Sequence, residues 1–254
     1  MLIRRFQAER LEVAVYESRE EMGAASAAQF ADRLRSTLAT QGKAAVIFAS
    51  APSQNEFLAS LREIDDIDWS RVTGFHLDEY IGIRGDHPAS FRRYIREHLI
   101  DRLPMGGFYD LRGDAPDPDA ECARYTALLA DAKPAVVALG IGENGHLAFI
   151  DPPVCDFQDP RDVRVVELDD VCRMQQVHDG CFAAFDDVPS RALTLTIPVF
   201  LRTPHAVVTV PGPTKVRAVQ AALDGPVITE CPASILRRHP DASLFLDKES
   251  AEWI

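Results

Sequence analysis

An apolar run that breaks into a glycine-rich polar loop constrains the fold of this chain more than any other stretch. The run Pro134–Leu139 is continuously hydrophobic, which is typical of a strand buried on both faces of a parallel sheet. Three glycines then surround a polar pair, and His146 and Asp151 follow. Glycine lets a backbone turn sharply and approach a ligand closely. The stretch predicts a central strand that ends in a ligand-binding loop, although a glycine-rich turn with a surface histidine is the plainer alternative.

Strand-like and helix-like segments alternate along the rest of the chain. The predicted strands are Leu11–Tyr16 at a sheet edge, Ala44–Ala49, Arg71–Leu77, Pro134–Ile141, Val163–Leu168, Ala192–Ile197, His205–Val210 and Ala242–Leu246. Helices are predicted after the capping residue Ser18 to about Gln41, from about Gln54, over Pro88–Leu99 and Pro118–Ala130, and from Pro213 to about Leu223. This alternation indicates the α/β class, with a doubly wound, mostly parallel sheet and helices on both faces. No linker or repeat interrupts it, so residues 1–254 are expected to form a single domain.

Charge and cysteine content argue against several classes of protein. The formal net charge is −12 and no run of Lys or Arg occurs, so no nucleic-acid partner is expected. No stretch is apolar enough to span a bilayer or to act as a signal peptide, which predicts no membrane association and a cytoplasmic location. The five cysteines show no CxxC spacing and are expected to be free thiols. His76, His87 and His146 lack zinc-like spacing, so no metal is expected.

Polar residues follow three of the predicted strands. Asp78 and Glu79 follow the first, residues 144–151 follow the second, and Thr214 and Lys215 follow the third. Loops at the carboxyl ends of parallel strands face the same side of the sheet. We therefore expect these three groups of residues to meet at one site.

Each group suits acid–base chemistry or anion binding. Adjacent carboxylates on an extended backbone point to opposite sides, so one of Asp78 and Glu79 can enter the site while the other is structural. A half-buried aspartate with a raised pKa can take a proton from carbon. His146 with a nearby carboxylate can move protons between a ring oxygen and water. Lys215, together with the Thr214 hydroxyl and backbone N–H groups, predicts an anion site, but no Walker A loop is present.

Four separated motifs, in the same order, carry a family resemblance. They are FHLDEYIGI followed by DHPASFRRYIREHL, then GIGENGHLAFIDPP, VPGPTKVRAVQAAL and CPASILRRHPDASLFLD. Together they resemble the glucosamine-6-phosphate deaminase/isomerase family, over residues 20 to 250 approximately. The resemblance implies a Rossmann-like single domain that binds a sugar phosphate and converts glucosamine 6-phosphate to fructose 6-phosphate and ammonia. It also implies that no cofactor is needed, because acid–base groups alone can form the enol(amine) intermediate.

The resemblance assigns a role to each candidate residue. Asp78 would move the C2 proton during aldose–ketose isomerisation. His146 would help to open the pyranose ring, with Asp151 standing where the family usually has the glutamate that pairs with this histidine. Lys215 would bind the phosphate.

Besides Asp151, three parts of the chain depart from the family pattern. Asn144 replaces the usual aspartate of the loop, so we expect Asn144→Asp to raise turnover. The first phosphate loop reads Ser50–Ser53, without glycines, and Pro52 lacks an N–H donor. The arginine that often precedes V-P-x-x-A-L in the family has no clear equivalent in Val177–Phe182, although Arg173 lies nearby. These departures predict a weakened anion site that keeps Lys215.

The predicted function is therefore that of an amino-sugar phosphate isomerase/deaminase. The predicted catalytic residues are Asp78, His146, Asn144 and Asp151, and the predicted substrate-binding residues are Ser50, Ser53, Glu79, Gly145 and Lys215. A related sugar-phosphate enzyme such as 6-phosphogluconolactonase, or a non-catalytic sugar-phosphate sensor, is the alternative. The sequence does not fix the oligomeric state, and a homo-oligomer is left open.

Overall fold

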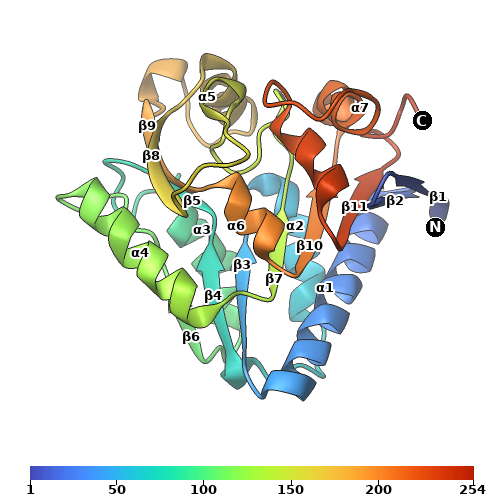
Figure 1. Cartoon of the computed structure of the whole chain (residues 1–254), viewed down its shortest axis with the longest axis horizontal. Coiled ribbons are helices and arrows are strands. Elements are labelled where there is room, and N and C mark those ends of the chain that lie inside the picture. The colour runs from blue at the N-terminus through green and yellow to red at the C-terminus, as the bar shows by residue number, and fades with distance from the viewer.

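The computed structural model describes all 254 residues, and its centre is an eight-stranded sheet (Figure 1). In spatial order the strands are β1 (Leu2–Ala8), β2 (Leu11–Tyr16), β11 (Ala242–Asp247), β10 (His205–Val210), β7 (Val136–Leu139), β3 (Ala44–Phe48), β4 (Val72–His76) and β6 (Gly107–Tyr109). Every neighbouring pair is parallel except β1 and β2. The sheet is thus mostly parallel, as predicted.

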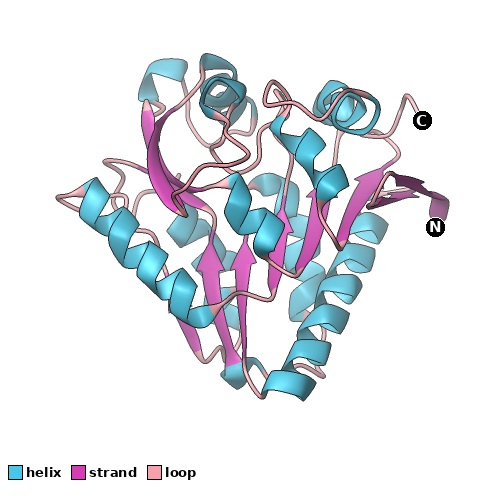
Figure 2. Ribbon diagram, in the orientation of Figure 1, coloured by secondary structure: helices cyan, strands magenta, loops and turns pink.

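Helices cover both faces of this sheet (Figure 2). They are α1 (Arg19–Gln41), α2 (Asn55–Arg62), α3 (Phe91–His98), α4 (Pro118–Ala132), α5 (Asp170–His178), α6 (Ile197–Arg202) and α7 (Val216–Asp224). Alternate residues of β3 enter two different cores: Val46 packs in the core that contains residues of α1 and α2, and Ile47 in the core that contains residues of α4, α6 and α7. A strand buried on both faces has no polar side, which explains its continuous hydrophobicity.

The winding of the sheet reverses between β3 and β7. From β3 the chain moves outward through β4 to β6, and from β7 it moves the opposite way through β10 to β11. The connections that leave β3 and β7 therefore diverge, which opens a crevice at the carboxyl ends of these adjacent strands. Both polar loops singled out in the sequence, at residues 50–53 and 140–151, lie at this reversal point.

A second, three-stranded antiparallel sheet stands beyond the carboxyl end of β4 (Figure 1). It contains β5 (Asp78–Tyr80), β9 (Arg191–Leu195) and β8 (Val163–Glu167). Leu77 joins the two sheets, since its N–H donates to Phe48 O at 3.2 Å and its carbonyl accepts from Leu195 N at 2.9 Å. Two predicted strands, 163–168 and 192–197, thus belong to this smaller sheet, in which β8 and β9 pair antiparallel with each other.

Other boundaries differ from the predictions in ways that packing explains. The segment Leu11–Tyr16 is not the edge of the sheet, because β1 pairs antiparallel with it and β11 covers its other side. The predicted helix from Pro88 begins only at Phe91, because Ser90 is its capping residue and accepts a hydrogen bond from Arg93 N. Ser18 does cap α1, with its hydroxyl accepting from Glu21 N at 3.3 Å. No helix has both the length and the apolar character that a membrane crossing requires.

Candidate active site

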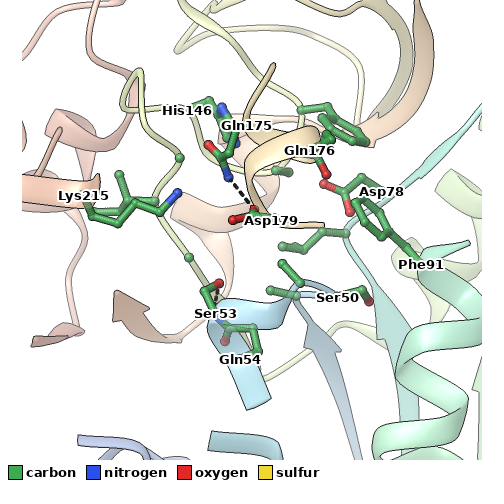
Figure 3. A pocket seen from close by; sticks show the side chains of 18 residues that line it. Ser50, Ser53, Gln54, Asp78, Phe91, His146, Gln175, Gln176, Asp179 and Lys215 are labelled. Carbon is green, nitrogen blue, oxygen red and sulfur yellow. Dashed lines mark hydrogen bonds between the residues drawn. The ribbon is translucent and has the colours of Figure 1, made fainter. Parts of the chain in front are cut away.

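A pocket lies at the point where the winding reverses, and residues that are distant in the sequence line it (Figure 3). Ser50 and Ser53 come from the connection after β3, Asp78 from β5, His146 from the loop after β7, and Lys215 from the turn after β10. These side chains are distant in sequence and share one space. The expected convergence of the strand ends is therefore present in the structure.

Asp78 and Glu79 turn to opposite sides of β5. Asp78 lines the pocket, whereas the fully buried Glu79 carboxylate accepts hydrogen bonds from the Ser90 hydroxyl at 2.7 Å and from the N–H groups of Phe91 and Arg92 at 3.1 and 3.0 Å. Glu79 thus satisfies the first donors of α3 and does not line the pocket, so the structure places this predicted substrate-binding residue outside the site. Alternation along the strand separates the two carboxylates.

The Asp78 carboxyl group holds a proton more tightly than an ordinary aspartate does. It is 6% exposed, and burial, followed by the neighbouring Glu79 charge, raises its pKa well above the usual value for aspartate. A carboxylate whose proton affinity is raised in this way is better able to remove a proton from carbon. The side chain lies on the pocket wall, where a ligand can reach it.

His146 is held by a chain of polar groups behind the pocket. Its Nδ1 lies 2.8 Å from Asn144 Oδ1 and 3.0 Å from Asp151 Oδ1, and Asn144 Nδ2 donates to the same Asp151 oxygen at 3.0 Å. Both partners of Nδ1 are acceptors, so in the neutral ring Nδ1 carries the hydrogen and Nε2 is left to accept a proton. Asn144 and Asp151 do not line the pocket, and they position the ring that does.

The Asp151 carboxylate is fully buried yet remains acidic. Burial alone would raise its pKa, but the hydrogen bond and charge of His146, with those from Asn144 and the Asp169 amide, outweigh it and hold the pKa below the usual value. Cys172 is buried beside this pair. One potential ligand atom from each of His146, Asp151 and Cys172 lies within 4.8 Å of the other two. These are the residues that could hold a metal ion, and the sequence did not reveal them because Cys172 is brought to them by α5.

Two glycines of the loop have clear structural reasons. A Cβ at Gly142 would lie 2.1–2.3 Å from three atoms of the His146 ring, so any side chain there would displace the imidazole. Gly145 has a φ of +83°, and its carbonyl accepts from Ala233 N at 2.8 Å. Gly145 shapes the turn before His146 and does not itself line the pocket.

Lys215 supplies the positive charge of the pocket. Its side chain is 5% exposed, and its Nζ makes no hydrogen bond with any protein group. Burial lowers the pKa of the ammonium, while the charges of Asp179 and Glu143 oppose this shift. A buried cation that lacks a partner within the protein is suited to an anionic or hydroxyl-bearing ligand.

A family match covers nearly the whole chain, all of these residues included. Residues 17–245 match the model of the family described as glucosamine-6-phosphate isomerases/6-phosphogluconolactonase. The chain belongs to this family. A glucosamine-6-phosphate deaminase from Exiguobacterium sibiricum is 35% identical over 192 residues, which are 75% of this chain and 73% of the relative. One from Streptococcus pneumoniae is 34% identical over 203 residues, 80% of this chain and 84% of that protein.

Solved structures agree with this assignment. The structure of a monomeric glucosamine-6-phosphate deaminase superposes with a TM-score of 0.88 at 27% identity, covering 95% of this chain and 99% of the other. A 6-phosphogluconolactonase from Shewanella baltica gives a TM-score of 0.78 at 18% identity, covering 95% and 100%. The second likeness shows the shared fold of the glucosamine-6-phosphate isomerase/6-phosphogluconolactonase family and nothing more.

Within this family fold, the end of the pocket near Lys215 has fewer hydrogen-bond donors for an anion than the sequence predicted. Thr214 is exposed and does not line the pocket, and the Gly212 N–H is already bonded to the Asp247 carboxylate at 3.1 Å. Pro213 begins a short 3-10 turn, Pro213–Lys215, and the α-helix starts only at Val216. The proposed group of donors thus reduces to the Lys215 ammonium, because the buried Asp247 captures the amide.

The first loop contributes hydroxyl and amide groups. The Ser50 hydroxyl is buried without a hydrogen-bond partner, and Ser53 accepts from Gln54 Nε2 at 3.3 Å. Gln54, which the sequence did not indicate, also lines the pocket and is anchored to Thr209 O at 3.2 Å, with its Oε1 unpaired. The loop therefore presents neutral polar groups to the pocket.

Helix α5 and the residue that ends it supply three further pocket residues that the sequence did not indicate: Gln175, Gln176 and Asp179. Arg173, the nearby candidate for the family's arginine, does not line the pocket. Its guanidinium donates to the carbonyls of Phe185 and Val188 at 3.1 and 2.8 Å. The only sequence signal for α5 was the capping residue Asp169, whose side chain accepts from Val171 N.

Proposed function

We propose that the protein is an amino-sugar phosphate isomerase/deaminase that converts glucosamine 6-phosphate and water to fructose 6-phosphate and ammonia. Membership of the glucosamine-6-phosphate isomerase/6-phosphogluconolactonase family and the relatives named as deaminases support this proposal. The observation that carries it is that Asp78, His146 and Lys215 line one pocket. A base, a proton shuttle and a cation are the groups that this reaction needs.

The geometry suggests how the reaction proceeds. The Lys215 ammonium binds the phosphate, which orients the sugar in the pocket. His146 accepts a proton at Nε2 and returns it to the ring oxygen, so that the pyranose opens, while Asp151 stabilises the charge on the imidazole. Asp78 then moves the C2 proton to C1. Water adds at C2, and the amine leaves as ammonia.

Solvent deuterium tests the proposal directly. Incubation with glucosamine 6-phosphate in D2O is expected to release ammonia and to introduce deuterium at C1 of the product, the carbon to which Asp78 delivers the proton. Asp78→Asn serves as the control, since it keeps the side-chain volume but removes the base. Absence of both exchange and ammonia at high protein concentration would instead support a sugar-phosphate sensor.

The variant Asp78→Asn also distinguishes a deaminase from a lactonase. Hydrolysis of 6-phosphogluconolactone requires no base at C2, so a lactonase would not depend on Asp78 in this way. We expect the protein to release ammonia and the lactone to be hydrolysed no faster than in buffer. Lactone hydrolysis that survives Asp78→Asn would overturn the deaminase assignment.

A further inference from the structure

The single lysine of the pocket is a poor match for the two negative charges of a phosphate group. Lys215 is the only lysine or arginine among the lining residues, and Asp179 places a carboxylate on the same pocket. Figure 3 shows the Lys215 ammonium and the Asp179 side chain facing the same space. A phosphate that binds Lys215 would therefore meet a negative charge nearby, and like charges repel each other.

Asp179 is held in this place by a relay of hydrogen bonds. Its Oδ2 accepts from Gln175 Nε2 at 3.2 Å, and Gln175 Oε1 accepts in turn from Glu143 N at 2.8 Å. Asp179 also closes the end of α5, with its N–H donating to Gln175 O at 2.8 Å. The carboxylate is half-buried and has defined partners, so it is a fixed part of the pocket wall.

A hydroxyl group satisfies this pair better than a phosphate does. It can accept a hydrogen bond from Lys215 Nζ, which has no partner in the protein, and donate one to the Asp179 carboxylate. The remaining polar groups nearby, the hydroxyls of Ser50 and Ser53 and the Gln54 amide, are neutral and suit a sugar hydroxyl equally well. No second lysine or arginine lines the pocket to compensate a charge of −2.

We propose that Asp179 is a specificity-determining residue that lets the pocket accept unphosphorylated 2-amino-2-deoxyhexoses as well as their 6-phosphates. This inference rests on the proposed function, because the same groups act at C1 and C2 in both substrates. The added reaction balances in the same way: glucosamine and water give fructose and ammonia. Only the group at C6, a hydroxyl in place of a phosphate, differs at the Lys215 and Asp179 end.

The test compares glucosamine with glucosamine 6-phosphate by ammonia release. The wild-type protein is expected to deaminate both sugars. Asp179→Asn, which keeps the shape but removes the charge, should increase the preference for the phosphorylated sugar in kcat/KM by about tenfold or more. Asp179→Ser should shift the preference in the same direction. Asp186→Asn, an exposed carboxylate outside the pocket, is the matched control and should leave the ratio unchanged.

The outcomes separate this inference from the proposed function. Deamination of glucosamine 6-phosphate alone overturns the role of Asp179 and leaves the deaminase proposal standing. Deamination of both sugars with a ratio that neither Asp179 variant moves, although both variants melt cooperatively, has the same meaning. Failure of the wild-type protein to release ammonia from either sugar, with no deuterium exchange, overturns both. Ammonia from both sugars and a ratio that responds to Asp179 but not to Asp186 supports the inference.

Discussion

The two ends of the pocket are built in opposite ways. At the His146 end, Nδ1 is bonded to Asn144 and Asp151, and Asp151 accepts from Asn144 and from Asp169 N. At the other end, Lys215 Nζ and the Ser50 hydroxyl have no partner in the protein. A buried polar group without a partner costs about 1–3 kcal/mol, so this end is left unsatisfied at the expense of stability. The His146 end is preorganised, whereas the Lys215 end keeps buried polar groups for which the protein supplies no partner.

This contrast assigns different consequences to substitutions at the two ends. A change in the preorganised network should alter turnover, because the network fixes the geometry and protonation of His146. A change at the unsatisfied end should alter KM and relieve the free protein of a buried unpaired group. Asp78 lies on the wall of the same pocket, so a substitution of Asp78 tests whether the reaction takes place there.

The largest expected effect is that of Asp78→Asn. Loss of the base should reduce ammonia release and deuterium incorporation from D2O by about 10²–10⁴-fold, the usual contribution of a general base. The variant should also be more stable at neutral pH, because the buried Asp78 carboxyl group has a raised pKa. In the wild type, stability is lost as pH rises from the unfolded-state pKa to the folded-state one, and asparagine does not titrate. Thermal unfolding against pH should show the gain vanish in acid, and a variant that keeps its activity would remove Asp78 from the mechanism.

Lys215→Ala should act on binding. Loss of a charge-assisted hydrogen bond of about 1.5–3 kcal/mol corresponds to a rise of about 10- to 150-fold in KM for glucosamine 6-phosphate. Turnover at saturation should change much less, since His146 and its partners are untouched. Lys215→Met is the control for volume, because it fills the same space without charge, and it should show the same rise in KM with a higher melting temperature. An unchanged KM in both variants would show that the unsatisfied end does not bind the substrate.

Asn144→Asp tests the preorganised end, and the structure reverses the expectation drawn from the sequence. Asn144 Nδ2 donates to Asp151 Oδ1 at 3.0 Å and lies 3.4 Å from Asp169 Oδ2. The substitution would bring a third carboxylate against these two, so we expect turnover to fall by about tenfold at neutral pH rather than rise. The loss should shrink as pH falls, because a proton shared between the introduced carboxylate and Asp151 would relieve the repulsion. A pH profile of kcat measures this, and an increase at neutral pH would favour the original expectation.

Sequence reasoning was most successful where local chemistry and periodicity decide the structure. The span of β10, His205–Val210, is as predicted, and α1 begins after Ser18 as its capping residue indicated. Loops at the carboxyl ends of parallel strands meet at a winding reversal, so the joint appearance of Asp78, His146 and Lys215 in one pocket followed from topology.

What the sequence did not reveal depends on tertiary contacts. The smaller sheet exists because β5, β8 and β9 pair with one another across long sequence separations, and no local pattern distinguishes them from strands of the main sheet. Three pocket residues, Gln175, Gln176 and Asp179, come from α5 and its end, and the only sequence signal for this helix is its capping residue Asp169. The Gly212 amide was expected in the anion site, but the distant Asp247 binds it.

The smallest effect on activity is expected for Glu79→Gln, which separates the two faces of β5. The Glu79 carboxylate accepts from the Ser90 hydroxyl and from three backbone N–H groups, those of Tyr80, Phe91 and Arg92. Burial raises the Glu79 pKa although these bonds oppose the shift. The NH2 group of glutamine would face these donors and leave them without an acceptor on that side. Unfolding in urea should therefore show the free energy of unfolding reduced by about 1–3 kcal/mol. The kcat and KM of the folded variant should change by less than about threefold, because the side chain points to α3 and acts on Asp78 only through its charge, which ranks after burial as a cause of the raised Asp78 pKa. A large loss of kcat/KM with unchanged stability would place Glu79 in the pocket and remove the distinction between the two carboxylates.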